Sequence, residues 1–585
     1  MYEFTTEQTD FLNSSGKVVL HACPGSGKTT IVAQKVVDYL KGWDNPHKGI
    51  AVLSFTNVAS EEIEHRVKEM LPHMNNINQP HFLGTLDSFI NNYIFLRFGY
   101  LLLPSRKRPS VIMNDIAKTY SYWRRECYQR GCVNNIEQFK WDDDKRLTQN
   151  DEIITCVGTR RFKAPCIEFK EMLLKKGLFY QDEIPSLSVI LLKKYPEIAK
   201  CISERFPIII LDEAQDTSVE QMKILDLLCE AGLESVYIVG DPDQSIYEWR
   251  TANPESFIEK MQDVQWKTYA LSENFRSSQR ICDATYVFSD MYKEKGPNKA
   301  SGDSANYTQK PVLCVYDSGI NTDVIISKFK DLCLSNNIEV SPENVAIVKR
   351  GKIHTDNVKD IWKTAETELL AKASYEWLCG DRKKAYNFCE RAIFQLTVKS
   401  NADDVVYIEE EVSKIMQYDL WKVIITDILV NLPSADIGCG PWITTIQSVI
   451  SRILSENDIN LIDNISIMDA IKIKSRDSTT PNFRLIPVKD FFQKKIQTEY
   501  TFSSVHGVKG ETFDAIMLLV ENIRGNTLTP SFLTRGDTDN ELMRIAYVAM
   551  TRPRKILMVA MPKSNASLDL RFPKEKWDYW EVKKD

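Results

Sequence analysis

A glycine-rich segment near the N-terminus has the residue types that bind phosphate. It runs from Ala22 through Gly25, Ser26 and Gly27 to Lys28-Thr29-Thr30, after an apolar run and before a helical pattern. Glycines let backbone N–H groups converge on phosphate oxygens, and the start of the following helix adds positive potential. We therefore expect Lys28 to reach the β- and γ-phosphates of a nucleotide and Thr29 to bind Mg²⁺. The alternative is a glycine-rich turn with an exposed lysine, and Ala22 stands where the first glycine is usual.

A pair of carboxylates follows a second apolar run. Asp212 and Glu213 come directly after Ile208–Leu211. Adjacent carboxylates at the end of a strand suit a nucleotide site, in which Asp212 binds Mg²⁺ and Glu213 polarises the attacking water. A solvated acidic turn is the alternative interpretation.

Short apolar runs recur along the chain between helical patterns. They are residues 50–55, 208–211, 236–239, 345–348, 515–519 and 556–559. Continuous apolar strands of this kind are typical of parallel sheets covered on both faces, so we predict an α/β fold. Ligands of such sheets bind beyond the carboxyl ends of the strands, where the polar segments above are located.

Composition limits the class of protein. A chain of 585 residues is too long for one hydrophobic core, and its net charge of −6 does not favour coating by nucleic acid, so any such contact must lie in a local groove. Its 13 cysteines are dispersed, which favours reduced thiols and argues against a zinc module. We found no apolar stretch long enough to span a membrane and no signal sequence, and we expect a cytoplasmic protein without a membrane partner.

Further segments make the chain resemble the UvrD/Rep-like superfamily 1 DNA helicases. In family order, the matching segments are residues 6–8, 22–29, 55–63, 84–89, 212–216, 240–250, 271–277, 506–514 and 546–552. They extend over nearly the whole chain. The resemblance implies two RecA-like parallel-sheet core domains of the P-loop NTPase type, each with a helical insertion. It also implies that ATP and Mg²⁺ bind between the two domains.

The resemblance assigns roles in nucleotide binding. Gln8 would read the adenine, Phe275 would stack on it, and Gln244 would sense the γ-phosphate. Arg276 and Arg552 would act as arginine fingers, because a guanidinium neutralises charge that spreads over the phosphoryl oxygens in the transition state. The predicted catalytic residues are Lys28, Asp212, Glu213, Gln244, Arg276 and Arg552. The predicted nucleotide-binding residues are Gln8, Ala22, Gly25, Ser26, Gly27, Lys28, Thr29, Thr30, Phe275 and Lys509.

The resemblance also predicts a track for single-stranded DNA. Its residues are Phe55, Thr56, Asn57, Thr85, Tyr247, Trp249 and His506. Aromatic faces bind bases by stacking, worth about 1–3 kcal/mol per base without sequence preference. A core position for Trp249 and a buried, hydrogen-bonded role for His506 are the alternatives.

Domain boundaries follow from where the motifs and the helical patterns lie. We predict a first RecA-like domain at 1–88 and 181–275 with a helical insertion at 89–180. The second RecA-like domain is expected at 276–352 and 497–585, with a helical insertion at 353–496.

The predicted function is ATP-dependent translocation on single-stranded or tailed duplex DNA, with 3′→5′ helicase activity implied by the resemblance alone. Two positions depart from the family: Asp87 stands where histidine is common, and Glu511-Thr512 where Leu-Glu is common. These departures and the short insertions also resemble the helicase-like subunit of Gabija-type antiphage systems. The alternative is therefore a nucleotide- and DNA-end-sensing subunit that regulates an OLD-family nuclease. A nucleotide kinase or GTPase is a third option, disfavoured by the stacking residues.

Overall fold

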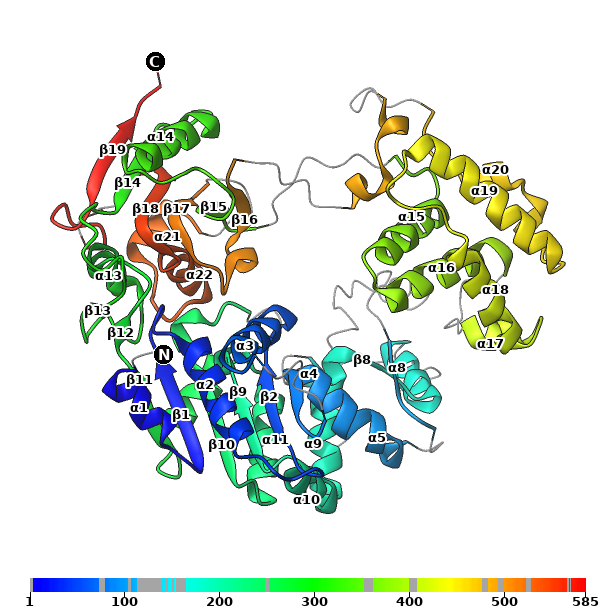
Figure 1. Cartoon of the computed structure of the whole chain (residues 1–585), viewed down its shortest axis with the longest axis horizontal. Helices are drawn as coiled ribbons and strands as arrows, with labels where there is room; N and C mark the ends of the chain where they lie inside the picture. The colour runs from blue at the N-terminus through cyan, green and yellow to red at the C-terminus, as the bar shows by residue number, and fades with distance from the viewer. Residues whose placement is uncertain are drawn as a thin grey trace. The chain divides into compact units, whose positions relative to one another are not determined.

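A computed structural model describes most of the chain as two compact units. The described residues are 4–72, 79–103, 107–112, 139–142, 146–149, 152–153, 165–247, 252–351, 361–398, 408–475, 482–492, 499–521, 528–564, 568 and 570–584. One unit, the core unit, comprises Met1–Asn114, Asn134–Ile353 and Thr498–Asp585. The other, the helical unit, comprises Asp115–Val133 and His354–Gln497 (Figure 1).

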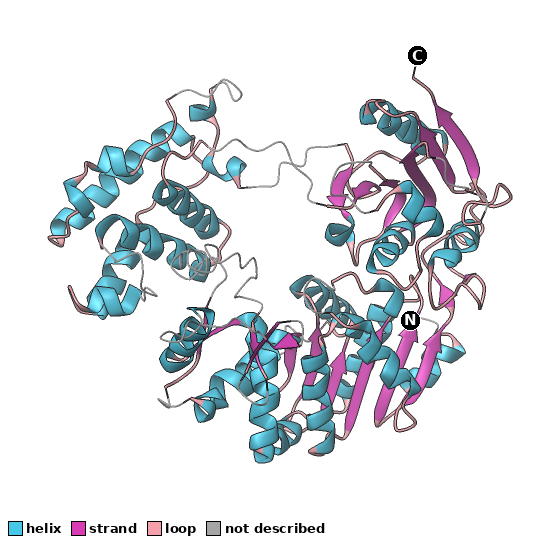
Figure 2. Cartoon of the chain, turned by 180° about the vertical axis from the view of Figure 1, so that it is seen from behind, coloured by secondary structure: helices cyan, strands magenta, loops and turns pink. Residues whose placement is uncertain are grey.

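The first of two parallel six-stranded sheets in the core unit begins with the strand that precedes the glycine-rich segment (Figure 2). Its strand order is β11-β1-β10-β9-β2-β3. The strands are β1 (Lys17–Ala22), β2 (Ile50–Ser54), β3 (Phe82–Thr85), β9 (Ile208–Leu211), β10 (Ser235–Gly240) and β11 (Lys267–Leu271). We call this sheet and the helices packed on it the first lobe.

Both faces of this sheet are covered, which explains why its strands are continuously apolar. Successive side chains of a strand point to opposite faces. Val19 packs in a core with α9 (Ile184–Lys194), α10 (Pro196–Arg205) and α11 (Val219–Glu230). Val18 packs in another core with α1 (Thr6–Leu12), α2 (Lys28–Lys41) and α3 (Asn57–Met70). An alternating strand would place polar groups in one of these two cores.

The second sheet has the same parallel construction. Its order is β16-β15-β17-β18-β14-β19. The strands are β14 (Val312–Tyr316), β15 (Val345–Lys349), β16 (Thr501–Ser504), β17 (Phe513–Leu519), β18 (Pro553–Pro562) and β19 (Asp578–Val582). Helices α13 (Gln279–Thr285) and α22 (Glu541–Met550) contribute to the core on one face, and α14 (Thr322–Ser335) to the core on the other. This is the second lobe.

The two sheets confirm the predicted fold of two RecA-like α/β domains. Each of the six predicted apolar runs forms a strand. The described part of 89–180 contains the helices α5 (Leu96–Phe98) and α8 (Pro165–Lys176) and also short strands, among them β4 (Ser110–Ile112) paired with β8 (Leu178–Tyr180). The exact domain boundaries stay a prediction.

The helical unit is built around two buried tryptophans, Trp421 and Trp442. Its helices are α15 (Ala365–Leu378), α16 (Arg382–Thr397), α17 (Ile408–Ser413), α18 (Tyr418–Val430), α19 (Cys439–Glu456) and α20 (Ile467–Ala470). Helices α15 and α16 pack against each other, as do α16 and α18. Within the described part of the whole chain, none of the helices is both long and apolar enough to cross a membrane.

Candidate active site

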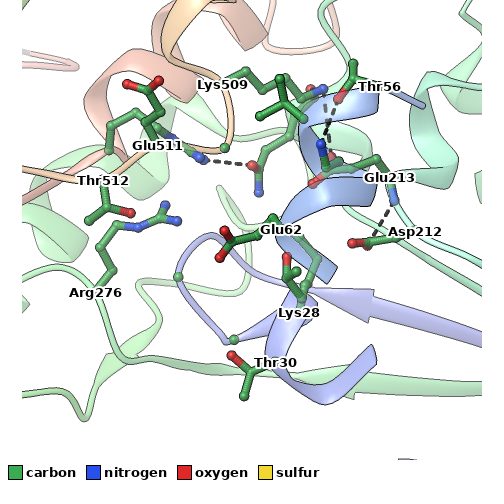
Figure 3. Close-up of a pocket in the computed structure, with 18 of the residues that line it drawn as sticks. Lys28, Thr30, Thr56, Glu62, Asp212, Glu213, Arg276, Lys509, Glu511 and Thr512 are labelled. Carbon is green, nitrogen blue, oxygen red and sulfur yellow. Dashed lines mark hydrogen bonds and ion pairs between the residues drawn. The ribbon is translucent and has the colours of Figure 1, made fainter. Parts of the chain in front are cut away.

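The glycine-rich segment forms a tight loop between β1 and α2. Gly25 has a φ of +75°, and Gly27, which caps α2, has a φ of +82°. Glycine adopts this left-handed region at little cost because it has no Cβ. The Ser26 hydroxyl donates to the Cys23 carbonyl at 2.7 Å and closes the loop. The loop thus delivers the N-terminus of α2, with its unpaired N–H groups, to the edge of a cavity (Figure 3).

Lys28 is the first residue of α2, and its ammonium group is largely buried. Its Nζ donates to the Ala22 carbonyl at 3.1 Å and lies 3.9 Å from Asp241 Oδ2. Asp241 follows β10 and is fully buried. The lysine charge is therefore balanced from within the first lobe.

The acidic pair lies at the carboxyl end of β9, as predicted. The Asp212 N–H donates to the Leu53 carbonyl of β2 at 2.9 Å, and the Glu213 N–H donates to Asp212 Oδ1 at 3.0 Å. Glu213 has a φ of 54°, a left-handed conformation that costs a residue with a Cβ about 1 kcal/mol. The sharp turn at Glu213 aims the two neighbouring carboxylates differently.

Their protonation differs as well. Burial, together with the neighbouring charge of Glu213, raises the pKa of Asp212 to about 7. Burial also acts to raise the pKa of Glu213, but the positive charges of Lys509 and Lys28 outweigh it, and the pKa is lowered. At neutral pH Glu213 is therefore ionised, while Asp212 is close to its midpoint. A bound divalent cation would drive Asp212 to its charged form.

The second lobe contributes two arginines to the same place. Arg276 Nη1 donates to the Thr551 carbonyl at 3.1 Å, and Arg552 Nε donates to the Val548 carbonyl at 3.1 Å. Burial and the charge of Arg552 lower the pKa of Arg276. Two guanidinium groups held together in a buried site favour an anion beside them.

Lys509 lies against the acidic segment of the first lobe. Its Nζ donates to Asp216 Oδ2 and, at 2.8 Å, to the Gln244 carbonyl, and it lies 3.9 Å from Glu213 Oε2. Burial raises the pKa of Asp216 to about 6. Burial alone would lower the pKa of Lys509, but Asp216 and Glu213 outweigh it and raise the pKa. Lys509 therefore stays charged at neutral pH and ties the two lobes together.

Gln244 connects the lobes through its side-chain amide. Its Oε1 accepts from Arg552 Nη2 at 2.7 Å, and its Nε2 donates to Asp241 Oδ2 at 2.6 Å. Asp241 also faces Lys28. A short polar chain therefore joins Arg552 of the second lobe to Lys28, which follows the glycine-rich loop of the first lobe.

A cavity of about 700 Å³ opens between these groups. Residues from both lobes line it, among them the glycine-rich loop of the first lobe and Arg276 and Arg552 of the second. The predicted site residues among its lining are Gly25, Ser26, Gly27, Lys28, Thr29, Thr30, Phe55, Thr56, Asp212, Glu213, Gln244, Tyr247, Arg276, Lys509 and Arg552.

The donor set of this cavity fits a nucleotide with Mg²⁺. Thr29 and Asp212 both line it and offer the oxygen ligands that Mg²⁺ prefers. Within the described ranges, no group of three or more His, Cys, Asp or Glu residues could hold a metal ion without further ligands. A cation at Thr29 and Asp212 would therefore depend on phosphate oxygens and water for its remaining ligands, as is usual for Mg²⁺.

Three predicted nucleotide-binding residues lie beside the cavity and do not line it: Gln8, Ala22 and Phe275. Gln8 Nε2 donates to the Ser26 carbonyl at 3.2 Å, and its Oε1 accepts from the Thr5 N–H at 3.1 Å. The Phe275 N–H donates to the Gly25 carbonyl at 2.9 Å, and its side chain is 38 % exposed. Gln8 and Phe275 therefore both contact the glycine-rich loop directly.

Three predicted DNA-binding residues form an aromatic row across the two lobes. The rings of Phe55 and Tyr247 are 5.0 Å apart, and those of Tyr247 and His506 are 5.5 Å apart. His506 Nε2 donates to the Ile246 carbonyl at 2.8 Å, and burial lowers the pKa of this histidine. His506 therefore presents a neutral ring to its neighbours.

The other predicted DNA-binding residues occupy helix starts or fall outside the description. Thr56 accepts from the Ala59 N–H and caps α3, whose first residue, Asn57, is exposed. Thr85 accepts from the Ser88 N–H and caps α4 (Leu86–Phe89). Trp249 lies outside the described residues.

Sequence reasoning missed Asp216 and Asp241 as site residues. Both lie within segments that it had singled out, and both are fully buried. Since buried carboxylates require partners, their burial beside lysines is the signal that the sequence could not display. It also gave no role to His21, which lies 3.9 Å from Asp241.

The fold and the cavity define a P-loop nucleotide-binding protein with two RecA-like lobes. Residues 4–265 match the model of the UvrD/REP helicase N-terminal domain. Across 97 % of this chain and 86 % of the relative, the sequence is 21 % identical to the ATP-dependent DNA helicase PcrA of Staphylococcus epidermidis. These matches confirm the resemblance to UvrD/Rep-like helicases.

Two further relatives match different extents of the chain. The ATP-dependent DNA helicase Rep of Escherichia coli is 27 % identical over 47 % of this chain and 41 % of its own length. The Gabija protein GajB of Bacillus cereus is 24 % identical over 95 % of both chains.

Proposed function

We propose that the protein is an ATP-dependent translocase and helicase that moves 3′→5′ on single-stranded DNA. One observation carries this proposal: a single cavity gathers Lys28, Asp212 and Glu213 from one lobe and Arg276 and Arg552 from the other. A site divided between two lobes changes when the lobes move, so nucleotide turnover can be converted into motion. The matches to PcrA and Rep support the choice of DNA as the track.

In this proposal each wall of the cavity has a task. Lys28 would bind the terminal phosphates of ATP, and Thr29 and Asp212 would hold Mg²⁺, which neutralises phosphate charge when it is bound. Glu213, ionised at neutral pH, would orient and deprotonate the attacking water. Arg276 and Arg552 would stabilise the charge that develops on the phosphoryl oxygens.

The aromatic row would be the part of the site that contacts DNA. Tyr247 lines the nucleotide cavity and also lies between Phe55 and His506. It therefore belongs both to the nucleotide site and to the proposed stacking surface. We expect a base stacked on these rings to change position when the lobes close on ATP.

A combined assay of ATP hydrolysis and unwinding tests the proposal. ATP turnover is measured with no DNA, with a single-stranded oligonucleotide and with a duplex that has a 3′ or a 5′ tail, and strand separation is followed in parallel. We expect stimulation by single strands and unwinding from the 3′ tail only. Lys28→Ala is the inactive control. Absence of ATP turnover on every DNA would refute the proposal.

A second candidate is a regulatory subunit that senses nucleotide and DNA ends and controls an OLD-family nuclease. The match to GajB over 95 % of both chains favours it. It predicts ATP turnover that responds to DNA without strand separation, together with a change of nuclease activity when the partner is added. Unwinding by the protein alone favours the first candidate.

A further inference from the structure

A histidine in β1, the strand that leads into the glycine-rich loop, contacts the second lobe. His21 is the fifth residue of β1 and is only 4 % exposed. Its ring stacks on Tyr292 with a centroid distance of 5.5 Å and an interplanar angle of 20°. The Tyr292 hydroxyl lies 3.2 Å from His21 Nε2. This contact is separate from the arginines of the nucleotide cavity.

Tyr292 is held in place by the segment that precedes it. This segment follows α13, and its Phe288 belongs to the second-lobe core. Asp243 of the first lobe accepts hydrogen bonds from the Ser289 hydroxyl, from the Asp290 N–H at 3.0 Å and from the Met291 N–H at 3.2 Å. The tyrosine ring therefore cannot shift without disturbing three hydrogen bonds to one carboxylate.

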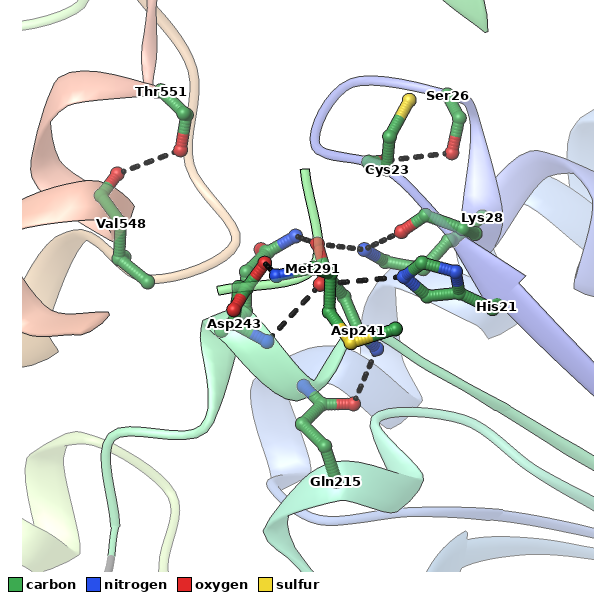
Figure 4. A network of polar contacts seen from close by, with 12 residues as sticks. His21, Cys23, Ser26, Lys28, Gln215, Asp241, Asp243, Met291, Val548 and Thr551 are labelled. Carbon is green, nitrogen blue, oxygen red and sulfur yellow. Dashed lines mark hydrogen bonds and ion pairs between the residues drawn. The ribbon is translucent and has the colours of Figure 1, made fainter. Parts of the chain in front are cut away.

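Asp241 lies near the same ring nitrogen of His21 (Figure 4). His21 Nε2 is 3.9 Å from Asp241 Oδ1, while Lys28 Nζ is 3.9 Å from Asp241 Oδ2. Gln244 Nε2 donates to the same Oδ2 at 2.6 Å, and the Asp243 N–H donates to Oδ1 at 3.2 Å. The Asp241 carboxylate thus orients both Lys28 and Gln244, the proposed sensor of the γ-phosphate.

The protonation state of His21 determines whether the Asp241 carboxylate balances the charge of Lys28 alone or that of His21 as well. Burial lowers the pKa of His21 and raises the pKa of Tyr292. The tyrosine therefore keeps its proton, and its hydroxyl donates to Nε2 when the neutral imidazole carries its proton on Nδ1. A protonated His21 would instead be a cation next to Oδ1 and would compete with Lys28 for the Asp241 charge.

We propose that His21 and Tyr292 are positioning residues for ATP turnover, which keep Asp241 aligned with Lys28 and Gln244 and tie that alignment to the second lobe. The inference rests on the proposed ATPase function and adds His21 and Tyr292 to the connections between the lobes. In this arrangement Tyr292 acts by occupying His21 Nε2, and neither side chain is assigned a contact with the nucleotide.

Tyr292→Phe tests the inference because it removes the hydroxyl and keeps the stacked ring. Without that donor, protonation of His21 becomes easier, while burial of the ring still holds its pKa below the ordinary value. The titratable groups that face it are Asp241, Lys28, Lys295 and Tyr292 itself. We expect kcat for ATP hydrolysis, relative to the unmodified protein, to fall about five-fold at the acid end of its pH profile, the size of one lost hydrogen bond, and to recover as the pH rises.

A second variant and a matched control separate this effect from a loss of stability. Adding His21→Gln to Tyr292→Phe supplies an acceptor that cannot be protonated, so the acid-side loss should disappear. Tyr316→Phe is the control: its buried hydroxyl donates to the Val520 carbonyl at 2.8 Å in the same lobe, away from Asp241, and its removal should leave the pH profile unchanged.

The outcomes distinguish this inference from the proposed function. If Tyr292→Phe hydrolyses ATP with the unmodified kcat and pH profile, the inference is wrong and the ATPase proposal stands. An acid-side loss that persists in the double variant also refutes it, because His21 is then not its source. Failure of the unmodified protein to hydrolyse ATP overturns both.

Discussion

Buried charge is organised differently in the cleft of the core unit and in the helical unit. In the cleft, Asp216 and Asp241 are buried beside Lys509 and Lys28. The contact between Asp216 and Lys509 crosses from one lobe to the other. The strength of that contact therefore depends on the relative position of the lobes, whereas the pair of Asp241 and Lys28 lies within the first lobe.

The helical unit buries Glu390, and its hydrogen-bond partners are neutral. The carboxylate accepts from the Tyr386 hydroxyl at 3.2 Å, the Tyr418 hydroxyl at 3.0 Å and the Trp421 Nε1 at 3.2 Å. Burial raises its pKa. All these donors come from α16 and α18, which pack against each other.

The difference shows that burial of a carboxylate does not by itself indicate a functional site. Glu390 is satisfied by donors on neighbouring helices, and its network holds those helices together. The carboxylates of the cleft are paired with cations, some of them supplied by the opposite lobe. A ligand that carries negative charge can take over those cations, and this makes the cleft suited to nucleotide binding.

The largest expected effect is that of Lys28→Ala. It removes the only ammonium group that the phosphate loop brings to the cavity, so ATP turnover should fall by about 1,000-fold or more. Steady-state ATP hydrolysis with saturating single-stranded DNA measures it. Lys41→Ala, at the exposed end of α2, is the matched control. Lys35 on the same helix is not suitable because it is buried. Residual turnover within ten-fold would contradict the role of Lys28.

Arg552→Ala should have the next largest effect. It removes a guanidinium from the second lobe and leaves Gln244 Oε1 without its donor. We expect kcat to fall about 100-fold or more with a much smaller change in the affinity for ATP, because the charge it stabilises develops in the transition state. Single-turnover hydrolysis and equilibrium nucleotide binding separate the two quantities. An affinity loss equal to the loss of kcat would assign Arg552 to binding alone.

The affinity for Mg²⁺-ATP should rise with pH through the neutral range. Asp212 must lose its proton to bind the cation, and its pKa is about 7, so affinity should rise about ten-fold per pH unit below that value and level off above it. Without ligands the effect on stability is opposite. The folded state holds this proton more tightly than the unfolded state, so the contribution of Asp212 to the free energy of unfolding falls between about pH 4 and pH 7.

Titrations of Mg²⁺-ATP at three pH values measure this dependence. Asp212→Asn should make the affinity weaker and nearly independent of pH in the same range. An affinity of the unmodified protein that does not change with pH would show that Asp212 does not bind the cation.

The smallest effect on activity is expected from Glu390→Ala, which tests the helical unit. It removes the acceptor that buried Trp421 shares with half-buried Tyr386 and Tyr418, and should lower the free energy of unfolding by about 2 kcal/mol. Turnover of ATP should stay within two-fold of the unmodified protein. Glu390→Gln keeps an acceptor and should cost less. A large loss of ATP turnover by a folded variant would mean that this network influences the cleft.

The sequence was most informative where function requires a particular residue type in a fixed local order. The glycines, Lys28 and the acidic pair were predicted at strand ends, and the structure has them there, because a strand–loop–helix connection leaves little freedom. Their roles in binding and catalysis stay predictions. The pairing of Lys509 with Asp216 could not be predicted, since 293 residues separate them and the contact depends on how the lobes pack.

Gln8 shows a further limit of sequence reasoning. Its reading of the adenine stays a prediction, and in the structure its side chain completes a capping box with Thr5 at the start of α1. Sequence patterns assign such a residue one role at a time, whereas the structure divides its hydrogen bonds between the helix start and the Ser26 carbonyl. Access of a base to Gln8 therefore competes with two existing contacts.

The backbone bond from Phe275 to Gly25 has a mechanical consequence. It joins the connection between the lobes to the glycine-rich loop. The two segments lie so close that a Cβ added at Gly25 would be 2.7 Å from Arg276 Cβ. Because this approach is so close, a change in the shape of the glycine-rich loop would also displace the connection between the lobes. In the proposed function, the segment that would receive the phosphate is thus hydrogen-bonded directly to the connection between the lobes.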